Sequence, residues 1–267
     1  MKILIIGGGN MGLTYAKSFL RSHITQQEDM MILEKSPEKA AQLAELNIGS
    51  VFGEPQDCLR QADLIILAVK PQDTPRLFET LRPEVEDQQV YLSIMAGVKI
   101  DTIRQGIGAS KIVRAMPNLP AQIGMGMTAY TASDDVTRIE LVMVQNLLNT
   151  TGKTIYVEDE SAIDATTAIS GSGPAYVFYF MDAMMQAARE MGFNESESEL
   201  LVKQTFRGTV ELYNKSNFSC QEWISKVSSR GGTTEAAMKA YHKRLVHEDI
   251  VAGAQAALAR AVELGKG

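Results

Sequence analysis

Three glycines near the start of the chain have the spacing of a phosphate-binding turn. Gly7, Gly9 and Gly12 lie in ILIIGGGNMGLTYAKSF, between an apolar run and a helical pattern. The first glycine of G-x-G-x-x-G makes the tight turn, the second admits a pyrophosphate, and the third lets helix and strand pack closely. Asn10 and Met11 open the helix, where free N–H groups attract phosphate. The segment therefore predicts dinucleotide binding, the alternative being a glycine turn of purely structural use.

The second expected strand ends in a mixed charge cluster, ILEKSPEK. An acidic side chain at this point, Glu34, accepts hydrogen bonds from the adenosine ribose hydroxyls and repels a 2′-phosphate. This favours NADH. Lys35, Ser36 and Lys39 would hold a 2′-phosphate if Glu34 turned away, so NADPH stays open as cofactor.

Two further segments end strands with polar residues, LAVKPQ and IVRAMPNLP. The carboxyl ends of strands in a doubly wound sheet face the ligand crevice. We therefore expect Lys70 to donate to ribose or nicotinamide groups and the Asn118 amide to pair with a polar ligand, unless they are a solvated lysine and an ordinary loop exit. The candidate cofactor residues here are Ala68, Val69, Lys70, Pro71, Met116, Pro117 and Asn118.

The first half of the chain alternates short apolar runs with helical patterns, which predicts a mostly parallel α/β sheet. The expected strands are Lys2–Ile6, Met30–Glu34, Ser50–Phe52, Leu64–Val69, Val90–Leu92, Lys111–Ala115, Met127–Thr131 and a more exposed Lys153–Asp159. The expected helices between them are Met11–Ser22, Pro37–Leu46, Gln72–Leu81, Ile100–Gly106 and Val136–Thr150.

After Asp159 the strand pattern stops and helical spacing takes over. The expected helices are Ala162–Ser170, Ala175–Met191, Ser196–Tyr213, Cys220–Val227, Thr234–Tyr241 and Val246–Leu264. We therefore predict two domains, a dinucleotide-binding domain over 1–158 and a helical domain over 159–267.

Composition excludes several classes of protein. The 267 residues carry a net charge of −6, which argues against nucleic acid as a partner. Cys58 and Cys220 give neither a disulfide framework nor a metal cluster. No apolar run approaches the ~20 residues of a membrane span, so we expect a cytoplasmic protein with no membrane partner.

A turn interrupts the helical half at SSRGGTTEAA. Adjacent glycines and threonines are poor helix formers, so Gly231, Gly232, Thr233 and Thr234 make a flexible, donor-rich turn ahead of the next helix. A second polar loop, ISGSGPAY, precedes an aromatic-rich helix that begins near Pro174.

The motifs GGGNMG, AVKPQ, RAMPNLP, ISGSGPAY and GGTTEAA, in this order, resemble those of pyrroline-5-carboxylate reductase over nearly the whole chain. The resemblance implies a Rossmann-type domain followed by a helical domain that dimerises by intertwining. It implies NAD(P)H-dependent reduction of L-1-pyrroline-5-carboxylate to L-proline, the last step of proline synthesis, by a homodimer or a ring of dimers.

The resemblance also assigns roles in the GGTTEAA turn. The N–H groups of Gly232 and Thr233 would hold the substrate carboxylate beside Gly231, and Ser229 would add a hydroxyl. Thr234 would be the catalytic residue, orienting the ring nitrogen or relaying a proton, the alternative being a helix cap. Since this turn is far in sequence from the nucleotide loops, we expect a site between domains.

Three departures from the family pattern leave the exact substrate and cofactor open. Arg230 stands where Ser-Pro-Gly-Gly has proline, and it either adds a charge to carboxylate recognition or projects into solvent. Trp223 and Ile224 replace a usual Leu-Arg pair, and Glu34 replaces the polar or basic residues of NADP-preferring members.

Three other functions are compatible with the two-domain plan. A reductase of another cyclic imine fits equally. A 3-hydroxyacid dehydrogenase would normally need a lysine base in the first helices of the second domain, and residues 162–191 contain none. A nucleotide-sensing protein without catalysis would be expected to lose the turn from Gly231 to Thr234.

Overall fold

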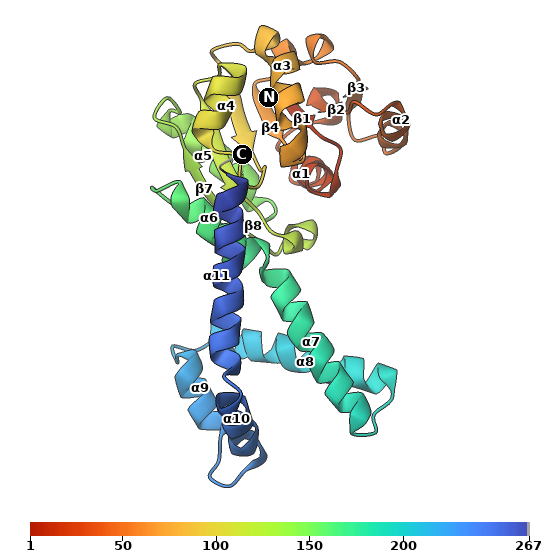
Figure 1. The fold of residues 1–267 in the computed structure, drawn as a ribbon. Helices are drawn as coiled ribbons and strands as arrows, with labels where there is room; N and C mark the ends of the chain where they lie inside the picture. Colours follow the sequence, from red (N-terminus) through yellow and green to blue (C-terminus); the bar gives the residue numbers. More distant parts are fainter. Residues whose placement is uncertain (266–267) are drawn as a thin grey trace. The chain divides into compact units, whose positions relative to one another are not determined.

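A computed structural model describes residues 1–265 of the chain (Figure 1). The chain forms two compact units, one of Met1–Ser172 with the residues from Ala257 onward, the other of Gly173–Ala256. The sequence predicts a domain boundary earlier, between residues 158 and 159. The segment between the two positions groups with the sheet, and the ion pairs of Arg114 described below account for that.

The first unit contains one eight-stranded sheet of order β3-β2-β1-β4-β5-β6-β7-β8. Its strands are β1 Ile3–Ile6, β2 Met30–Leu33, β3 Ser50–Phe52, β4 Leu64–Leu67, β5 Val90–Ser93, β6 Ile112–Met116, β7 Gly126–Ala132 and β8 Gly152–Tyr156. All neighbouring strands are parallel except the β6–β7 pair. The mostly parallel sheet and its exposed last strand are confirmed.

Helices cover both faces of this sheet, as expected of a doubly wound fold. They are α1 Asn10–Arg21, α2 Pro37–Glu45, α3 Thr74–Leu81, α4 Ile100–Ile107, α5 Arg138–Asn149 and α6 Ser161–Thr166, followed by a π-helix, Thr167–Gly171. One apolar core contains Phe19 of α1 and Val144 of α5, and the other contains Phe78 of α3 and Ile103 of α4. The strands alternate their side chains between these two cores, which is why β1, β2, β4 and β5 are apolar throughout.

Short 3₁₀ turns join several of these elements. They are Gln27–Asp29, Pro55–Asp57, Leu59–Gln61, Pro71–Asp73, Arg82–Glu84 and Leu119–Ile123. The turn Pro71–Asp73 leads directly from the end of β4 into α3, so it carries Asp73 to the carboxyl edge of the sheet.

The second unit is entirely helical, as the sequence predicts. Its helices are α7 Gly173–Glu190, α8 Glu195–Asn214, α9 Cys220–Val227, α10 Thr233–Lys243 and α11 Val246–Leu264, the last of which continues into the first unit. The helices α8 and α9 begin with reciprocal capping boxes, Asn194 with Glu197 and Ser219 with Glu222, which satisfy their first N–H groups. Among the described residues, no helix is long and apolar enough to cross a membrane.

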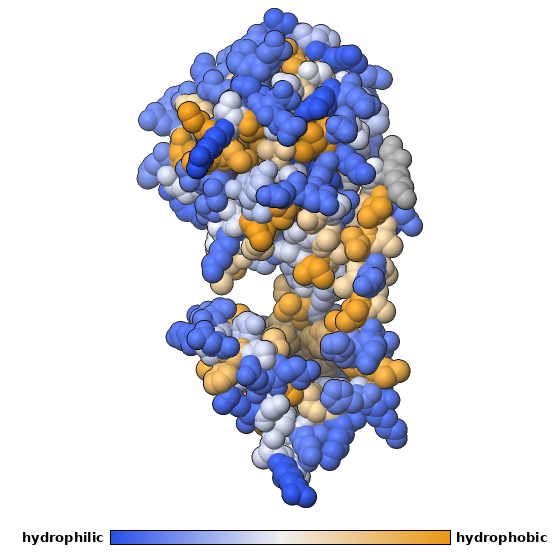
Figure 2. Space-filling view, turned by 90° about the vertical axis from the view of Figure 1, so that its left-hand side faces the viewer, coloured by the Kyte–Doolittle hydropathy of each residue, from blue (hydrophilic) through white to orange (hydrophobic). Residues whose placement is uncertain are grey.

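Many large apolar side chains of this helical unit are exposed (Figure 2). They gather on α7, α8 and the first half of α11, for example Val177, Phe178, Tyr179, Leu200 and Ile250. So many exposed apolar side chains favour an interaction site on these helices.

Candidate functional site

The glycine turn between β1 and α1 has the backbone that a nucleotide-binding loop requires. Gly7 has φ +104°, and a Cβ there would lie 2.8 Å from the Ala68 carbonyl oxygen. A Cβ on Gly12 would collide with the Gly7 carbonyl oxygen, so the turn and α1 pack too closely for any side chain. Gly9 differs, because a Cβ there would meet nothing within 4 Å.

The N-terminus of α1 fits a pyrophosphate. Gly9 is its N-cap and has no side chain to accept from the first N–H groups, and Asn10 and Met11 are the first helical residues. Those N–H groups have no partner within the helix, and the helix dipole favours negative charge there. Open space above Gly9 and free donors beside it make a cradle for phosphate oxygens.

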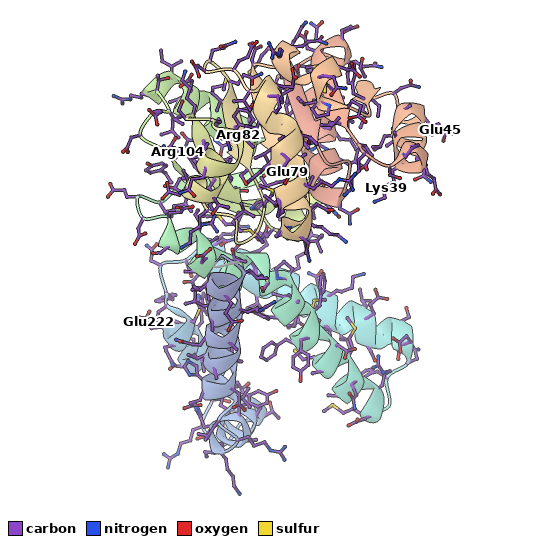
Figure 3. All side chains as sticks on the ribbon, turned by 45° about the horizontal axis from the view of Figure 1, so that its top comes forward. Lys39, Glu45, Glu79, Arg82, Arg104 and Glu222 are labelled. Atoms are coloured by element: carbon purple, nitrogen blue, oxygen red, sulfur yellow. The ribbon has the colours of Figure 1, made fainter. Side chains whose placement is uncertain are left out.

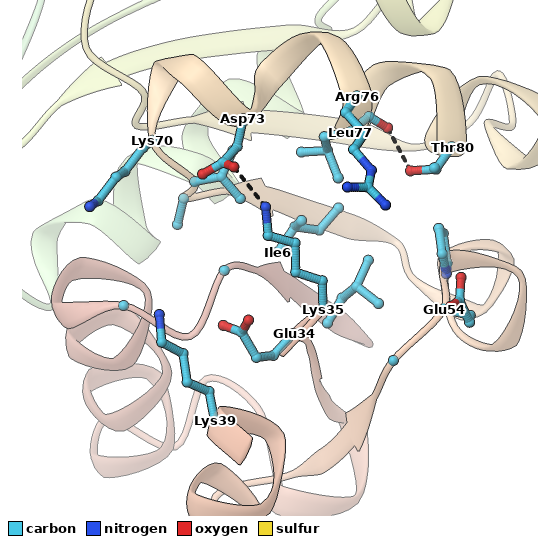
Figure 4. A pocket seen from close by; sticks show the side chains of 17 residues that line it. Ile6, Glu34, Lys35, Lys39, Glu54, Lys70, Asp73, Arg76, Leu77 and Thr80 are labelled. Carbon is cyan, nitrogen blue, oxygen red and sulfur yellow. Dashed lines mark hydrogen bonds and ion pairs between the residues drawn. The ribbon is translucent and has the colours of Figure 1, made fainter. Parts of the chain in front are cut away.

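A cavity of about 400 Å³ lies along the carboxyl edge of the sheet (Figure 4). Its lining comes from the glycine turn, the ends of β2 and β4, the first turn of α2, the loop after β3, and α3 with the residue before it. The lining residues are Ile6, Gly7, Gly9, Leu33, Glu34, Lys35, Lys39, Gly53, Glu54, Pro55, Ala68, Val69, Lys70, Asp73, Arg76, Leu77 and Thr80.

The structure brings part of the expected cofactor set into this cavity. Seven of the expected residues line it: Gly7, Gly9, Glu34, Lys35, Ala68, Val69 and Lys70. The others flank the lining in sequence (Asn10, Met11, Gly12, Ser36 and Pro71) or lie at the end of β6 (Met116, Pro117 and Asn118).

Glu34 is tied to the backbone around it. One carboxylate oxygen accepts from the Ser36 N–H at 3.0 Å and the other from the Gly8 N–H at 3.4 Å. The side chain therefore points toward the glycine turn. This is the position from which an acidic residue at the end of the second strand meets a ribose hydroxyl.

Opposite charges meet across the cavity at Lys35 and Asp73. The Lys35 ammonium lies 2.7 Å from a carboxylate oxygen of Asp73, the residue that precedes α3. The hydrogen bond from Lys35 lowers the pKa of the Asp73 carboxyl, and the charges of Lys70 and Lys39 act in the same direction. Asp73 is therefore fully ionised at neutral pH.

A second polar group lies where β6 ends. The Asn118 amide nitrogen donates to the Ser170 hydroxyl at 3.1 Å, and its oxygen accepts from the Met127 N–H at 2.9 Å. Ser170 belongs to the π-helix, and a Cβ on its neighbour Gly171 would lie 2.9 Å from the terminal methyl group of Met116. Such π-helical turns occur frequently at functional sites.

The turn between α9 and α10 has glycine-dependent geometry. Gly231 has φ +73°, a left-handed conformation that side chains disfavour. Its N–H donates to the Glu235 carboxylate at 2.6 Å, and the Gly232 N–H donates to the Ser229 carbonyl at 2.9 Å. Gly232 is the N-cap of α10 and Thr233 its first residue, so Thr234 lies inside the first helical turn.

Two family models match the chain, one in its helical part and one in its N-terminal part. One, described as pyrroline-5-carboxylate reductase dimerisation, matches residues 160–264, and one described as NADP oxidoreductase, coenzyme F420-dependent, matches residues 2–97. A curated relative is pyrroline-5-carboxylate reductase 2 of Bacillus subtilis (strain 168), which is 32% identical over 252 residues and matched over 94% of this chain and 90% of its own length. The chain belongs to the pyrroline-5-carboxylate reductase family.

Solved structures of the family have the same fold. A pyrroline-5-carboxylate reductase from Coxiella burnetii is 30% identical with a TM-score of 0.89, matched over 100% of this chain and 99% of its own. A pyrroline carboxylate reductase from Plasmodium falciparum with NADP bound is 26% identical with a TM-score of 0.90, matched over 99% and 98%. The predicted family, α/β fold and NAD(P)H-dependent class are confirmed.

Sequence reasoning missed one side of the cavity. Arg76, Leu77 and Thr80 belong to α3 and Asp73 precedes it, while residues 53–55 come from the loop after β3. The available signal was the position of a helix start directly after the strand that ends in LAVKPQ, since helices that follow parallel strands begin at the carboxyl edge.

Proposed function

We propose that this protein reduces L-1-pyrroline-5-carboxylate to L-proline with NADH or NADPH. The proposal rests on two features of one chain. The first unit has a cavity with the residues of a nucleotide-binding edge, and the GGTTEAA turn lies in the segment that matches the dimerisation model of pyrroline-5-carboxylate reductases. The nicotinamide of the bound cofactor supplies the hydride. The reaction is the last step of proline synthesis.

The residues at the glycine turn hold the dinucleotide in this proposal. The N-terminus of α1 binds the pyrophosphate, Glu34 accepts from the adenosine ribose, and Lys70 donates at the end of β4. Asn118 is held between Ser170 and the Met127 backbone, which fixes the strand exit near Met116 and Pro117. We assign that exit to the nicotinamide side of the site.

The substrate carboxylate takes its N–H donors from the start of α10. Of the two N–H donors that the sequence predicts, that of Gly232 donates to the Ser229 carbonyl and that of Thr233 has no partner in the first helical turn. We therefore assign the carboxylate to the N–H groups of Thr233 and Thr234 in place of Gly232 and Thr233. The Ser229 hydroxyl lies against the Gly232 Cα, where a side chain would displace it. The glycines thus leave room for Ser229 and for the ligand together.

Thr234 is the proposed catalytic residue. The N-cap of α10 is Gly232, so the Thr234 hydroxyl is not the cap of this helix. We assign the hydroxyl to the ring nitrogen, which it orients or supplies with a relayed proton.

We further propose that the helical part, from residue 159 onward, forms a homodimer, alone or within a ring of dimers. The family dimerisation segment and the exposed apolar side chains of α7, α8 and α11 support this. The cytoplasmic location stays a prediction, which fractionation of the source cells would test.

The function is tested by following NADH or NADPH oxidation at 340 nm. Pyrroline-5-carboxylate is compared with a panel of small cyclic imines that lack the carboxylate or differ in ring size. We expect pyrroline-5-carboxylate to have the highest kcat/KM and proline to be the product. A carboxylate-free imine that is reduced as well would overturn the substrate assignment.

A further inference from the structure

We propose that Asp73 sets the cofactor preference of this enzyme by engaging the Lys35 ammonium, which would otherwise pair with a 2′-phosphate. The inference rests on the proposed function, and it concerns a pair of residues in the cavity of the first unit. The pairing disfavours NADPH without removing any contact to NADH.

The two residues come from opposite walls of the cavity (Figure 4). Lys35 follows β2 and Asp73 precedes α3, and their charged atoms are 2.7 Å apart across the lining. The Lys35 side chain therefore extends over the cavity toward α3. An unpaired Lys35 would be free to turn back toward the end of β2.

The end of β2 is where a 2′-phosphate would lie. The acidic residue of a dinucleotide fold hydrogen-bonds the ribose 2′-hydroxyl, so a phosphate on that oxygen lies beside Glu34 and its neighbour Lys35. Glu34 repels the phosphate and is held in place by the Gly8 and Ser36 N–H groups. Lys35 is the cation that follows Glu34 in the chain, and Asp73 pairs with it at 2.7 Å, whereas Lys39, also expected to hold a 2′-phosphate, has no such partner among the described residues.

The Asp73 carboxylate does not cap the helix that follows it. Asp73 occupies the N-cap position of α3, but its side chain accepts no hydrogen bond from the first turn of that helix. Its hydrogen bond with Lys35 lowers its pKa, the charges of Lys35, Lys70 and Lys39 act in the same direction, and all four residues line the cavity. Lys39, Lys70 and Arg76 also line the cavity, and none of them has an ion-pair partner within 4 Å among the residues described.

The test is the Asp73→Asn variant, which keeps the size of the side chain and removes its charge. Dissociation constants for NADP⁺ and NAD⁺ are measured by titration of the full-length protein, together with KM and kcat for NADPH and NADH. We expect NADP⁺ to bind about two- to fivefold more tightly, as for an exposed charge pair, and NAD⁺ binding to change by less than twofold. The gain falls as salt is added.

A double-mutant cycle with Lys35→Ala separates this mechanism from a general field effect. Asp73→Asn should have no effect on NADP⁺ affinity in the Lys35→Ala background. Asp135→Asn is the matched control, because Asp135 pairs with Arg104 of α4 outside the cavity lining. Figure 3 shows that Arg104 of this control pair lies on α4, while Lys39 of the cavity lining lies on α2, and these two helices cover opposite faces of the sheet.

The outcomes are distinct from those of the assay for function. An unchanged ratio of NADP⁺ to NAD⁺ affinity in Asp73→Asn overturns the inference. So does an Asp73→Asn gain in NADP⁺ affinity that is equally large in the Lys35→Ala background. A wild-type protein that binds neither nucleotide overturns it as well. Nucleotide binding needs no imine substrate. A protein that shows the affinity shift but does not reduce pyrroline-5-carboxylate contradicts the proposed function alone.

Discussion

Gly9 and Gly12 belong to the same sequence motif but are glycines for different physical reasons. Gly12 is buried against the Gly7 carbonyl, so its missing side chain serves the packing of α1 on the sheet. Gly9 has ordinary backbone angles, φ −77° and ψ −177°, and open space above it. The packing around it therefore does not require a glycine at this position.

Alanine at each position should therefore give opposite results. Gly12→Ala should lose about 1–3 kcal/mol of unfolding free energy, because the methyl group forces backbone to move. Gly9→Ala should keep the melting temperature of the wild type and weaken NAD(P)H binding about tenfold, because the methyl group occupies the phosphate cradle. Thermal denaturation and nucleotide titration of both variants measure this. A Gly9→Ala protein that binds nucleotide normally would remove Gly9 from the site.

Thr234 is tested at the same scale. If its hydroxyl acts on the ring nitrogen in the transition state, Thr234→Ala should lower kcat about tenfold to a hundredfold and change KM much less. Thr102→Ala, on the exposed face of α4, is the matched control and should leave both constants unchanged. Wild-type kcat and KM in Thr234→Ala would refute the role.

At the residue scale, the sequence predicts the half of the cavity that has a motif. The glycine turn and Glu34 are recognisable because both belong to the known sequence pattern of dinucleotide-binding folds. Asp73 and Arg76 belong to no such pattern. They line the cavity because α3 starts directly after the turn Pro71–Asp73. Which side chains of a helix start face a ligand depends on its orientation, and a single sequence does not encode that locally.

Among the elements, α6 is held to the sheet by charges inside the protein. Arg114 of β6 is 1% exposed, and its guanidinium pairs with Glu160 at 3.0 Å and Asp164 at 2.6 Å. Glu160 also accepts from the Ile100 N–H at 2.8 Å. These bonds place α6, and with it the π-helix that carries Ser170, beside the end of β6.

Removing one carboxylate of this network should be costly. Asp164→Ala should lower the unfolding free energy by about 3 kcal/mol, because Arg114 is left buried with fewer partners. Asp135→Ala breaks the exposed pair with Arg104 and should cost less than about 1 kcal/mol. Denaturant unfolding measures both. Equal losses in the two variants would mean that burial does not raise the cost of breaking the Arg114 pair.

The sequence predicts the helices and strands themselves, but not the direction of β7 in the sheet or the π-helical turn after α6. The patterns place all eight strands and the helices within a few residues, because burial on both faces forces apolar runs. They do not give the antiparallel direction of β7, which depends on how residues 117–125 return the chain. They also do not distinguish the π-helix from the expected helix over 162–170, because five residues are too few to separate the two periods.

For the whole molecule, the proposed dimer makes a prediction about solution behaviour. Phe178 of α7 is 59% exposed, and a charge there should separate the subunits if α7 lies in the interface. We expect Phe178→Asp to reduce the mass measured by analytical ultracentrifugation to that of one chain. Ile139→Asp is the matched control, since Ile139 is 83% exposed on α5 of the sheet unit and should leave the mass unchanged. A monomeric wild-type protein would contradict the proposed dimer.

The path of α11 has a consequence for how the protein is made. Its final residues belong to the first unit, where Leu264 lies so close to Gly97 that a Cβ on the glycine would be 2.9 Å from the Leu264 Cβ. A ribosome releases the eight strands long before it reaches these residues, and all of the helical unit is made in between. Domains otherwise fold as units in the order of their synthesis. In this chain the nucleotide-binding unit receives its last helical turns only after the whole helical unit has been synthesised.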